Sequence, residues 1–247
     1  MRRLYIDIET IPDNLAHMPH LDDLEFYTEP EVIKQPGNIK RPEKIKEWKL
    51  NTLPIKQAIA EEKALRETQE KYEKAYTKWS KGALDECDSR IITIALAIDD
   101  GLVYRTQMNE EINLLKEFFE FIKDQLGSDL YKTKWVAFNA KFDFSILAAK
   151  ALKYNLDDWD LVPWNFSKYN PGAKNVFDPM LMFPHKDPMR HHSQDKIAKF
   201  LDIEGSKTNM TGKDVLPYYL EGKHQLIAEY CAEDVEVLRK ISKRLGV

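Results

Sequence analysis

The chain has 247 residues, which is within the range of a single α/β domain, so we expect one main core. Its 37 Lys and Arg against 41 Asp and Glu give a net charge of −4, which argues against a protein that coats nucleic acid through bulk charge but allows a local basic groove. The two cysteines, Cys87 and Cys231, match no zinc or disulfide pattern, so we expect a reducing, cytoplasmic setting. No apolar run is long enough to span a membrane.

The first predicted element is a strand over residues 4–9. Apolar residues alternate there with a second set, in the period of a strand with two different faces: Leu4, Ile6 and Ile8 against Tyr5, Asp7 and Glu9. Asp7 and Glu9 therefore share one face and can converge on one hard cation. Taken alone, this pair would be better explained as the solvent-facing acids of an edge strand.

Residues 12–89 read as an insertion after this strand. Residues 12–33 carry six acids and no Lys or Arg, and prolines at 30, 36, 42 and 54 predict a loop. Residues 55–81 contain no Gly or Pro and predict one long, charged helix. Its apolar side is thin, with a seven-residue repeat of Ala58, Leu65, Tyr72 and Trp79. We interpret this helix as a solvated arm or lid rather than a coiled coil.

Residues 34–81 hold 13 Lys and Arg against 7 Glu, a local charge of +6, and four interleaved aromatics: Trp48, Tyr72, Tyr76 and Trp79. A basic element with aromatics can follow a single nucleic-acid strand by pairing with phosphates and stacking on bases. The alternative is a solvated helix whose aromatics pack on the core.

Regular α/β signals resume at residue 91. The patterns predict, in order, a buried strand at 91–98, its hairpin partner at 102–106, a helix at 110–126, a strand at 134–138, a helix at 143–154, a strand at 175–182 and helices at 193–201 and 224–245. This order favours one α/β domain over residues 1–247, with a mixed sheet flanked by helices.

Asn139 and Asp143, in the motif FNAKFD, lie where a predicted strand gives way to a helix. Ligands of α/β sheets gather at such junctions, which makes these residues a second candidate cluster. The structural alternative is a capping role for Asn139 and a favourable helix-dipole position for Asp143.

Tyr230 and Asp234, in the motif YCAED, are four residues apart in the last helix and so are neighbours on one face. They lie along the edge of an apolar stripe formed by Ile227, Cys231, Leu238, Ile241 and Leu245. An Asp at the rim of a buried stripe needs a partner, and an ion pair with a lysine is the structural alternative.

Together, LYIDIET, FNAKFD and YCAED resemble, in this order, the DEDD superfamily of ribonuclease-H-like 3′-5′ exonucleases, and the Y-x-x-x-D form of the last motif is similar to its DEDDy branch. NVFDPMLMF, SQDKIAKFLDI and KTNMTGKDVLPYYLEGKHQLIAEYCAEDVEVL resemble stand-alone exonucleases related to the proofreading domain of family-B DNA polymerases. The resemblance covers about residues 1–11 and 90–245. It implies a ribonuclease-H-like mixed β-sheet flanked by helices, with a largely helical insertion after the first strand.

The resemblance also implies the catalytic residues. The metal-binding carboxylates would be Asp7, Glu9, Asp143 and Asp234, and the hydroxyl of Tyr230 would lie near the nucleophilic water. Two divalent ions about 3.5 to 4 Å apart can activate water and stabilise both the attacking and the leaving oxygen. Because the ligands are all oxygen, we expect two Mg²⁺ or Mn²⁺ ions rather than Zn²⁺.

Three further residues, Thr10, Asn139 and Phe142, match positions that in such enzymes contact the terminal nucleotide or shape its pocket. Asp178 matches a family aspartate that is usually structural, so we leave it out of the metal set.

The expected function is metal-dependent hydrolysis from the 3′ end of DNA, with single strands favoured. The expected partners are nucleic acid and replication or recombination proteins, in DNA replication or repair, and no membrane. Three alternatives stay open: an exoribonuclease that trims RNA 3′ ends, a catalytically silent nucleic-acid-binding or polymerase-associated module, and a ribonuclease-H-like endonuclease that has no need of Tyr230.

Overall fold

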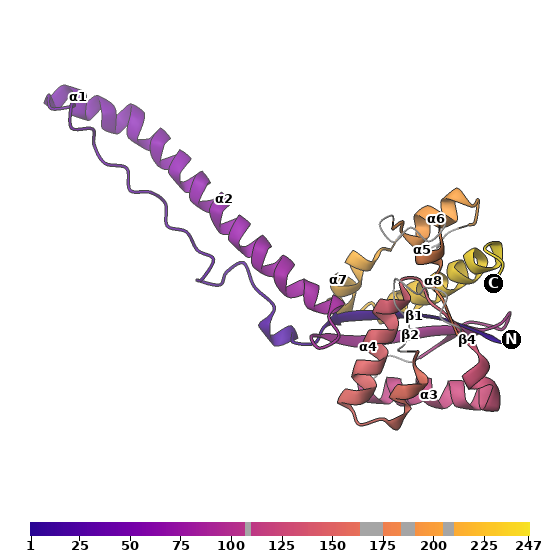
Figure 1. The fold of residues 1–247 in the computed structure, drawn as a ribbon. Coiled ribbons are helices and arrows are strands. Elements are labelled where there is room, and N and C mark those ends of the chain that lie inside the picture. The colour runs from indigo at the N-terminus through magenta and orange to yellow at the C-terminus, as the bar shows by residue number, and fades with distance from the viewer. Residues whose placement is uncertain (107–109, 164–174, 184–190, 205–209) are drawn as a thin grey trace. The chain divides into compact units, whose positions relative to one another are not determined.

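The computed structural model describes residues 1–106, 110–163, 175–183, 191–204 and 210–247 (Figure 1). The chain divides into two compact units, which we call the core unit (Met1–Asp13 and Gly82–Val247) and the insertion unit (Asn14–Lys81). The first three residues of the last run in the polymerase-like resemblance, residues 207–209, lie outside the described residues. Within the described part of the chain, no helix is both long and apolar enough to cross a membrane.

The core unit is built on a mixed sheet with the strand order β3-β2-β1-β4-β5 in the described residues. β1 is antiparallel to β2 and parallel to β4, so it lies at the centre. The strands are β1 (Arg3–Pro12), β2 (Ser89–Ile98), β3 (Tyr104–Arg105), β4 (Lys134–Val136) and β5 (Val176–Phe177).

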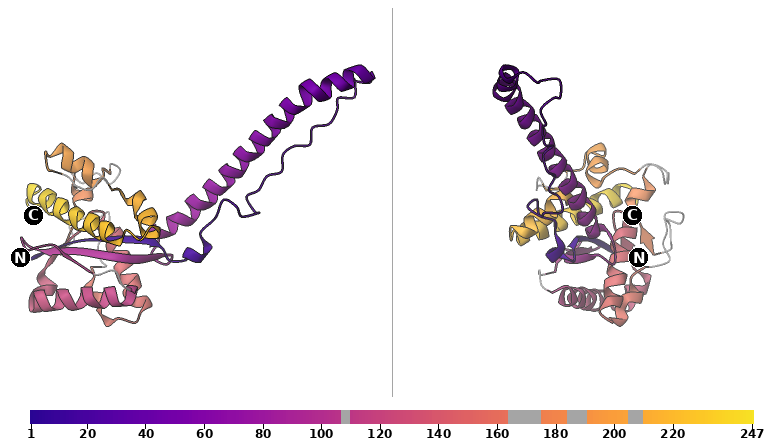
Figure 2. Two further views of the ribbon diagram at one scale, coloured as in Figure 1. Left: turned by 180° about the vertical axis from the view of Figure 1, so that it is seen from behind. Right: turned by 90° about the vertical axis from the view of Figure 1, so that its left-hand side faces the viewer.

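Helices cover both faces of this sheet (Figures 1 and 2). α3 (Glu111–Leu126) and α4 (Ala140–Lys153) pack on one face, over the alternate β1 residues Leu4, Ile6 and Ile8. α8 (His224–Arg244) packs on the other face, over Tyr5. The predicted alternation along the first strand is therefore confirmed, and Asp7 and Glu9 lie on the α8 side.

The remaining helices of the core unit are short. They are α5 (Pro179–Met182), α6 (Gln194–Phe200) and α7 (Val215–Leu220), with 3₁₀ turns at Gly127–Lys132, Asp157–Leu161 and Gly212–Asp214. A 3₁₀ turn at Lys81–Leu84 spans the boundary between the two units.

The insertion unit contains a short 3₁₀ turn (Leu15–His17) and a helical run formed by α1 (Pro42–Glu47), a π-helical turn (Trp48–Thr52) and α2 (Leu53–Ser80). Tyr72 contacts Phe26 with ring centroids 6.0 Å apart, and Tyr76 lies 5.9 Å from Tyr72 and 5.7 Å from Trp79. These aromatics therefore pack on one another inside the unit.

Most predicted elements of the core unit are confirmed, and the structure departs from the expectations at one place in the core unit and two in the insertion unit. The strand predicted at 175–182 ends at Phe177, because Asp178 caps α5 and Pro179 opens that helix. The proline-rich stretch predicted as a loop contains α1, which begins at Pro42, because proline is favoured in the first turn of a helix. The seven-residue repeat is not the buried side of α2, since Leu65 is 69% exposed whereas Ala60 and Ala64 are buried.

Asp178 joins the end of β5 to the start of α4. Its fully buried carboxylate accepts hydrogen bonds from the backbone N–H groups of Asn139 (3.1 Å), Ala140 (2.9 Å) and Met180 (2.9 Å). Asn139 precedes α4 in a left-handed conformation (φ 59°, ψ 47°) and makes no side-chain capping bond of its own. Burial raises the pKa of Asp178 to about 6, against the opposing effect of these hydrogen bonds.

We expect Asp178→Ala to lower the free energy of unfolding by about 3 kcal/mol or more, because three N–H donors in a buried region would lose their acceptor. Urea unfolding followed by circular dichroism measures this loss. Glu120→Ala, at an exposed position of α3, is the control and should change stability little. Equal effects of the two substitutions would contradict the capping role.

Candidate active site

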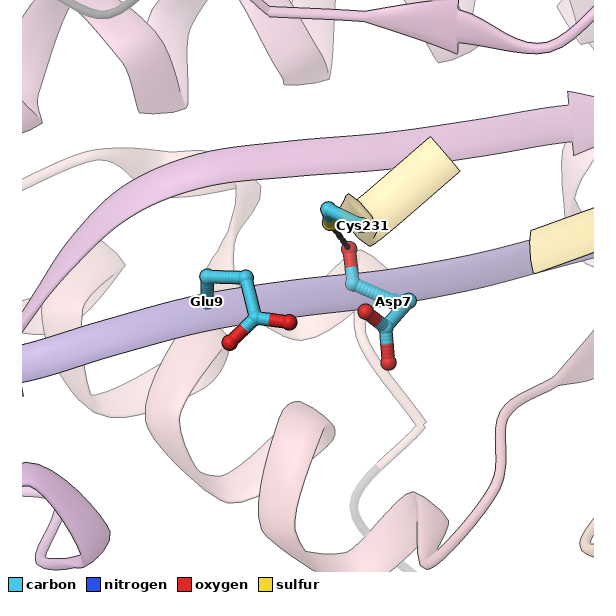
Figure 3. A group of neighbouring side chains, drawn as sticks. All are labelled: Asp7, Glu9 and Cys231. Carbon is cyan, nitrogen blue, oxygen red and sulfur yellow. Dashed lines mark hydrogen bonds between the residues drawn. The ribbon is translucent and has the colours of Figure 1, made fainter. Parts of the chain in front are cut away.

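Asp7 and Glu9 project from β1 toward the α8 side of the sheet (Figure 3). One carboxylate oxygen of each lies within 4.8 Å of the other and of the Sγ atom of Cys231. The Cys231 thiol donates a hydrogen bond to the backbone carbonyl of Asp7 at 3.4 Å, which fixes α8 against β1 at this point. The sheet register shifts directly after Glu9, between Glu9 and Thr10, so the regular pairing with β2 is interrupted beside the two acids.

Asp143 reaches β1 from the first turns of α4. β4 pairs only with Arg3–Tyr5, so further along β1 that edge has no strand partner among the described residues. Asp143, which is 2% exposed, uses one oxygen to accept the backbone N–H of Ile8 at 3.3 Å. The short β4 thus leaves a place at the sheet edge that this carboxylate occupies.

Tyr230 and Asp234 lie one helical turn apart on α8 and are hydrogen-bonded through their side chains. The side-chain amide of Gln194 donates to the backbone carbonyl of Asp234 at 2.9 Å, which ties this part of α8 to α6. The hydroxyl and the carboxylate are therefore held together at the edge of the buried stripe.

The pKa of each of the four carboxylates is raised, and nearby negative charges contribute to each rise; for Asp234 these are the charges of Asp195 and Glu233. Burial is the largest cause for each, and the pKa of Glu9 rises further because of the charges of the other three. The pKa of Asp7 is raised next by Asp234, and that of Asp143 by Asp7. The pKa of Asp234 rises to about 7 although the Tyr230 hydroxyl opposes the rise. The predicted acids from three separate motifs therefore lie close enough for their charges to interact.

A protein-family model described as "Predicted 3'-5' exonuclease related to the exonuclease domain of PolB" matches residues 84–237. This range is more than half of the chain, and it includes Asp143, Tyr230 and Asp234.

The chain belongs to this family of 3′-5′ exonucleases.

The solved structures that share the fold of this exonuclease include the family B DNA polymerase from the hyperthermophilic archaeon Pyrobaculum calidifontis, with a TM-score of 0.50, 16% sequence identity and coverage of 66% of this chain. The match covers 22% of the polymerase, so the exonuclease chain corresponds to a small part of it. The expected ribonuclease-H-like sheet flanked by helices is confirmed. No curated protein sequence matches the chain.

The donors of the exonuclease site fit divalent cations. Oδ2 of Asp7 is buried and has no hydrogen-bond partner among the described residues. In the same part of the chain, none of the four carboxylates forms an ion pair with Lys, Arg or His. Clustered acids without a basic partner need another positive charge, and oxygen donors favour Mg²⁺ or Mn²⁺. Burial raises the pKa of Cys231 well above its usual range, so it stays a neutral thiol.

The three expected substrate contacts differ in their surroundings. The hydroxyl of Thr10 donates to the carbonyl of Ala83 at 2.6 Å, and Thr10 is 9% exposed. The side chain of Asn139 is exposed at the start of α4, whereas Phe142 is half-buried against the core beneath that helix. Asn139 is thus the most available of the three.

Two supporting residues were not predicted. The sequence pattern places Cys231 only in the apolar stripe. Its position beside Tyr230 in the motif is the signal that indicates its contact with the backbone of Asp7. Gln194 lies in a different helix, and nothing in its sequence neighbourhood indicates a bond to Asp234.

The raised pKa values give the metal-free protein a defined pH dependence. In the unfolded chain these carboxyls titrate near pH 4, whereas in the folded state the pKa of Asp234 is about 7. The folded state therefore binds protons more tightly, and the stability from these groups is fully present below about pH 4 and is lost as pH rises through about 7.

We expect Asp7→Asn, which removes one charge from the cluster, to raise the melting temperature of the metal-free protein at about pH 8 and to flatten its decline between about pH 5 and 8. Thermal unfolding in a chelator measures both effects. Asp124→Asn, at an exposed position, is the matched control. Parallel curves for Asp7→Asn and wild type would contradict the electrostatic account.

Proposed function

We propose that this exonuclease is metal-dependent and removes nucleotides from the 3′ end of DNA, with single strands preferred. The observation that carries the proposal is the pairing of Asp7 and Glu9, whose carboxylate oxygens lie within 4.8 Å of each other, beside an Asp7 oxygen that is buried and lacks a hydrogen-bond partner among the described residues. The charges of Asp143 and Asp234 lie close enough to raise the pKa of Glu9. Such a cluster is costly unless cations neutralise it.

In this proposal Asp7, Glu9, Asp143 and Asp234 hold two Mg²⁺ or Mn²⁺ ions. When bound, such ions supply an activated water and stabilise negative charge on the oxygens of the phosphodiester. The hydrogen bond from the Ile8 N–H fixes the carboxylate of Asp143, and the Cys231 thiol fixes the backbone of Asp7.

Tyr230 orients the attacking water in this proposal. Its pKa is raised above its usual value by burial and then by the negative charge of Asp234, so the hydroxyl keeps its proton at neutral pH. A protonated hydroxyl is a hydrogen-bonding group and not a strong base. Asn139, Phe142 and Thr10 would contact the terminal nucleotide.

The family's relation to the polymerase exonuclease domain suggests the setting. DNA replication or repair would supply 3′ ends, and replication or recombination proteins would be the protein partners.

Digestion of matched 5′-labelled single-stranded DNA and RNA with Mg²⁺ or Mn²⁺ tests the reaction. We expect a metal-dependent ladder that shortens from the 3′ end of DNA, and a loss of more than about 1,000-fold in Asp7→Ala, because a ligand of the ions that would stabilise the transition state is removed. Asp124→Ala should keep full activity. Preference for RNA would favour the exoribonuclease, internal cuts the endonuclease, and binding without cleavage the silent module.

Tyr230→Phe removes one oxygen and keeps the ring. We expect kcat to fall by up to about 100-fold with little change in KM, since the hydroxyl orients water and does not hold the strand. Single-turnover digestion measures the chemical step. Tyr131→Phe, at a residue that is 79% exposed, is the matched control. An unchanged kcat in Tyr230→Phe would remove the hydroxyl from the mechanism.

A further inference from the structure

The insertion unit separates its charges into two blocks of opposite sign. Residues 14–33, the acidic segment, carry five Asp and Glu and no Lys or Arg. Residues 34–56, the basic segment, carry seven Lys and Arg and two Glu. The two segments therefore hold formal charges of −5 and +5.

The blocks do not neutralise each other within one chain. Among the described residues of the insertion unit, the ion pairs are Lys63–Glu67 and Arg66–Glu62, and all four residues lie on α2 outside both segments. The acidic segment is attached to the later part of α2, where the Thr28 N–H bonds to Thr68 Oγ1 at 3.1 Å. The basic segment forms α1 and the start of α2, at the opposite end of the unit (Figure 1).

Distance explains why the charges stay unpaired. The contact of Thr28 with Thr68 lies 15 residues from the start of α2 at Leu53, which is about 22 Å along the helix, whereas charges in physiological salt are screened over about 8 Å. Most acids of one segment therefore have no basic residue of the other segment within effective reach in the same chain.

Both segments also expose large apolar side chains. In the basic segment Leu50 and Ile55 are 65% and 62% exposed, and Ile59, just beyond it on α2, is 60% exposed. A groove of about 540 Å³ lies at the basic end, lined by Pro42, Ile45, Lys46, Lys49 and Leu50. In the acidic segment Leu24 is 90% and Val32 78% exposed. Exposed apolar patches rimmed by charge are typical of protein interfaces.

We propose that the insertion units of two copies of this chain pair antiparallel, with the basic segment of each copy against the acidic segment of the other. A two-fold axis makes both contacts at once, because the same surface is self-complementary. An interface of standard size uses about 20 to 30 residues per partner, and the two segments of each copy supply that number.

The surface chemistry favours a second copy over nucleic acid as the occupant. A nucleic-acid strand would match the basic segment but would leave the acidic segment repelled and the aliphatic side chains without apolar partners. The aromatics Tyr72, Tyr76 and Trp79, which could stack on bases, already pack on one another and on Phe26.

Charge reversal tests the pairing in the full chain. The basic-segment variant carries Lys44→Glu, Lys46→Glu and Lys49→Glu, and the acidic-segment variant carries Asp22→Lys, Glu25→Lys and Glu29→Lys. Sedimentation velocity should show a wild-type dimer that weakens with added salt. Each variant alone should raise the dimer dissociation constant by at least about 100-fold, because like charges then face each other.

Mixing the two variants is the decisive arm. Each variant then meets a partner of opposite charge, so a heterodimer should form although neither variant dimerises alone. Contacts within one chain could not be rescued in this way. Unchanged helical circular dichroism and unchanged digestion of a short oligonucleotide show that both variants are folded, and the readout of association does not depend on nuclease activity.

A monomeric wild type would overturn the proposal, as would a mixture that stays monomeric. A monomeric wild type whose affinity for DNA falls in the basic-segment variant would instead assign the basic segment to nucleic acid.

Discussion

Mutual repulsion among four buried carboxylates is the constraint on which the core unit depends. The charge of Asp234 raises the pKa values of Asp7 and Glu9, and the charge of Asp7 raises those of Glu9 and Asp143, so their proximity is unfavourable without a cation. Neutral contacts oppose this cost at two places: the Cys231 thiol bonds the backbone of Asp7, and the Ile8 N–H bonds Asp143. The apolar faces on both sides of β1 supply the remaining stability.

The order and lengths of the strands determine where the four carboxylates lie. β1 is central, and its two acids pair with β2 beyond the end of β4, on the sheet face that α8 covers. β4 is shorter than β1, and the edge it leaves open admits Asp143 at the start of α4. Asp178 holds that start in place by binding the N–H groups of Asn139 and Ala140. A residue without a proposed catalytic role thus determines where a proposed metal ligand lies.

Local patterns in the sequence predicted the strands and long helices of the core unit. Alternation along residues 4–9 gave the correct faces, and the four-residue spacing of Tyr230 and Asp234 gave one helix face. Hydrogen bonds between residues far apart in the sequence leave no such pattern. The bond from Gln194 to Asp234 and the bond from the Asn139 N–H to Asp178 do not follow from the residues beside Gln194 or Asp178 in the sequence. At Pro42 the sequence predicts a loop where α1 begins, because proline is common both in loops and in the first turn of a helix.

Calorimetric titration of Mg²⁺ and Mn²⁺ into the metal-free protein measures whether these four carboxylates form a two-ion site. We expect two bound ions per chain, proton release below about pH 7, where Asp234 still carries its proton, and loss of binding in Asp7→Asn. Binding that Asp7→Asn leaves unchanged, or no binding at any pH up to about 8, would contradict a two-ion site at these carboxylates.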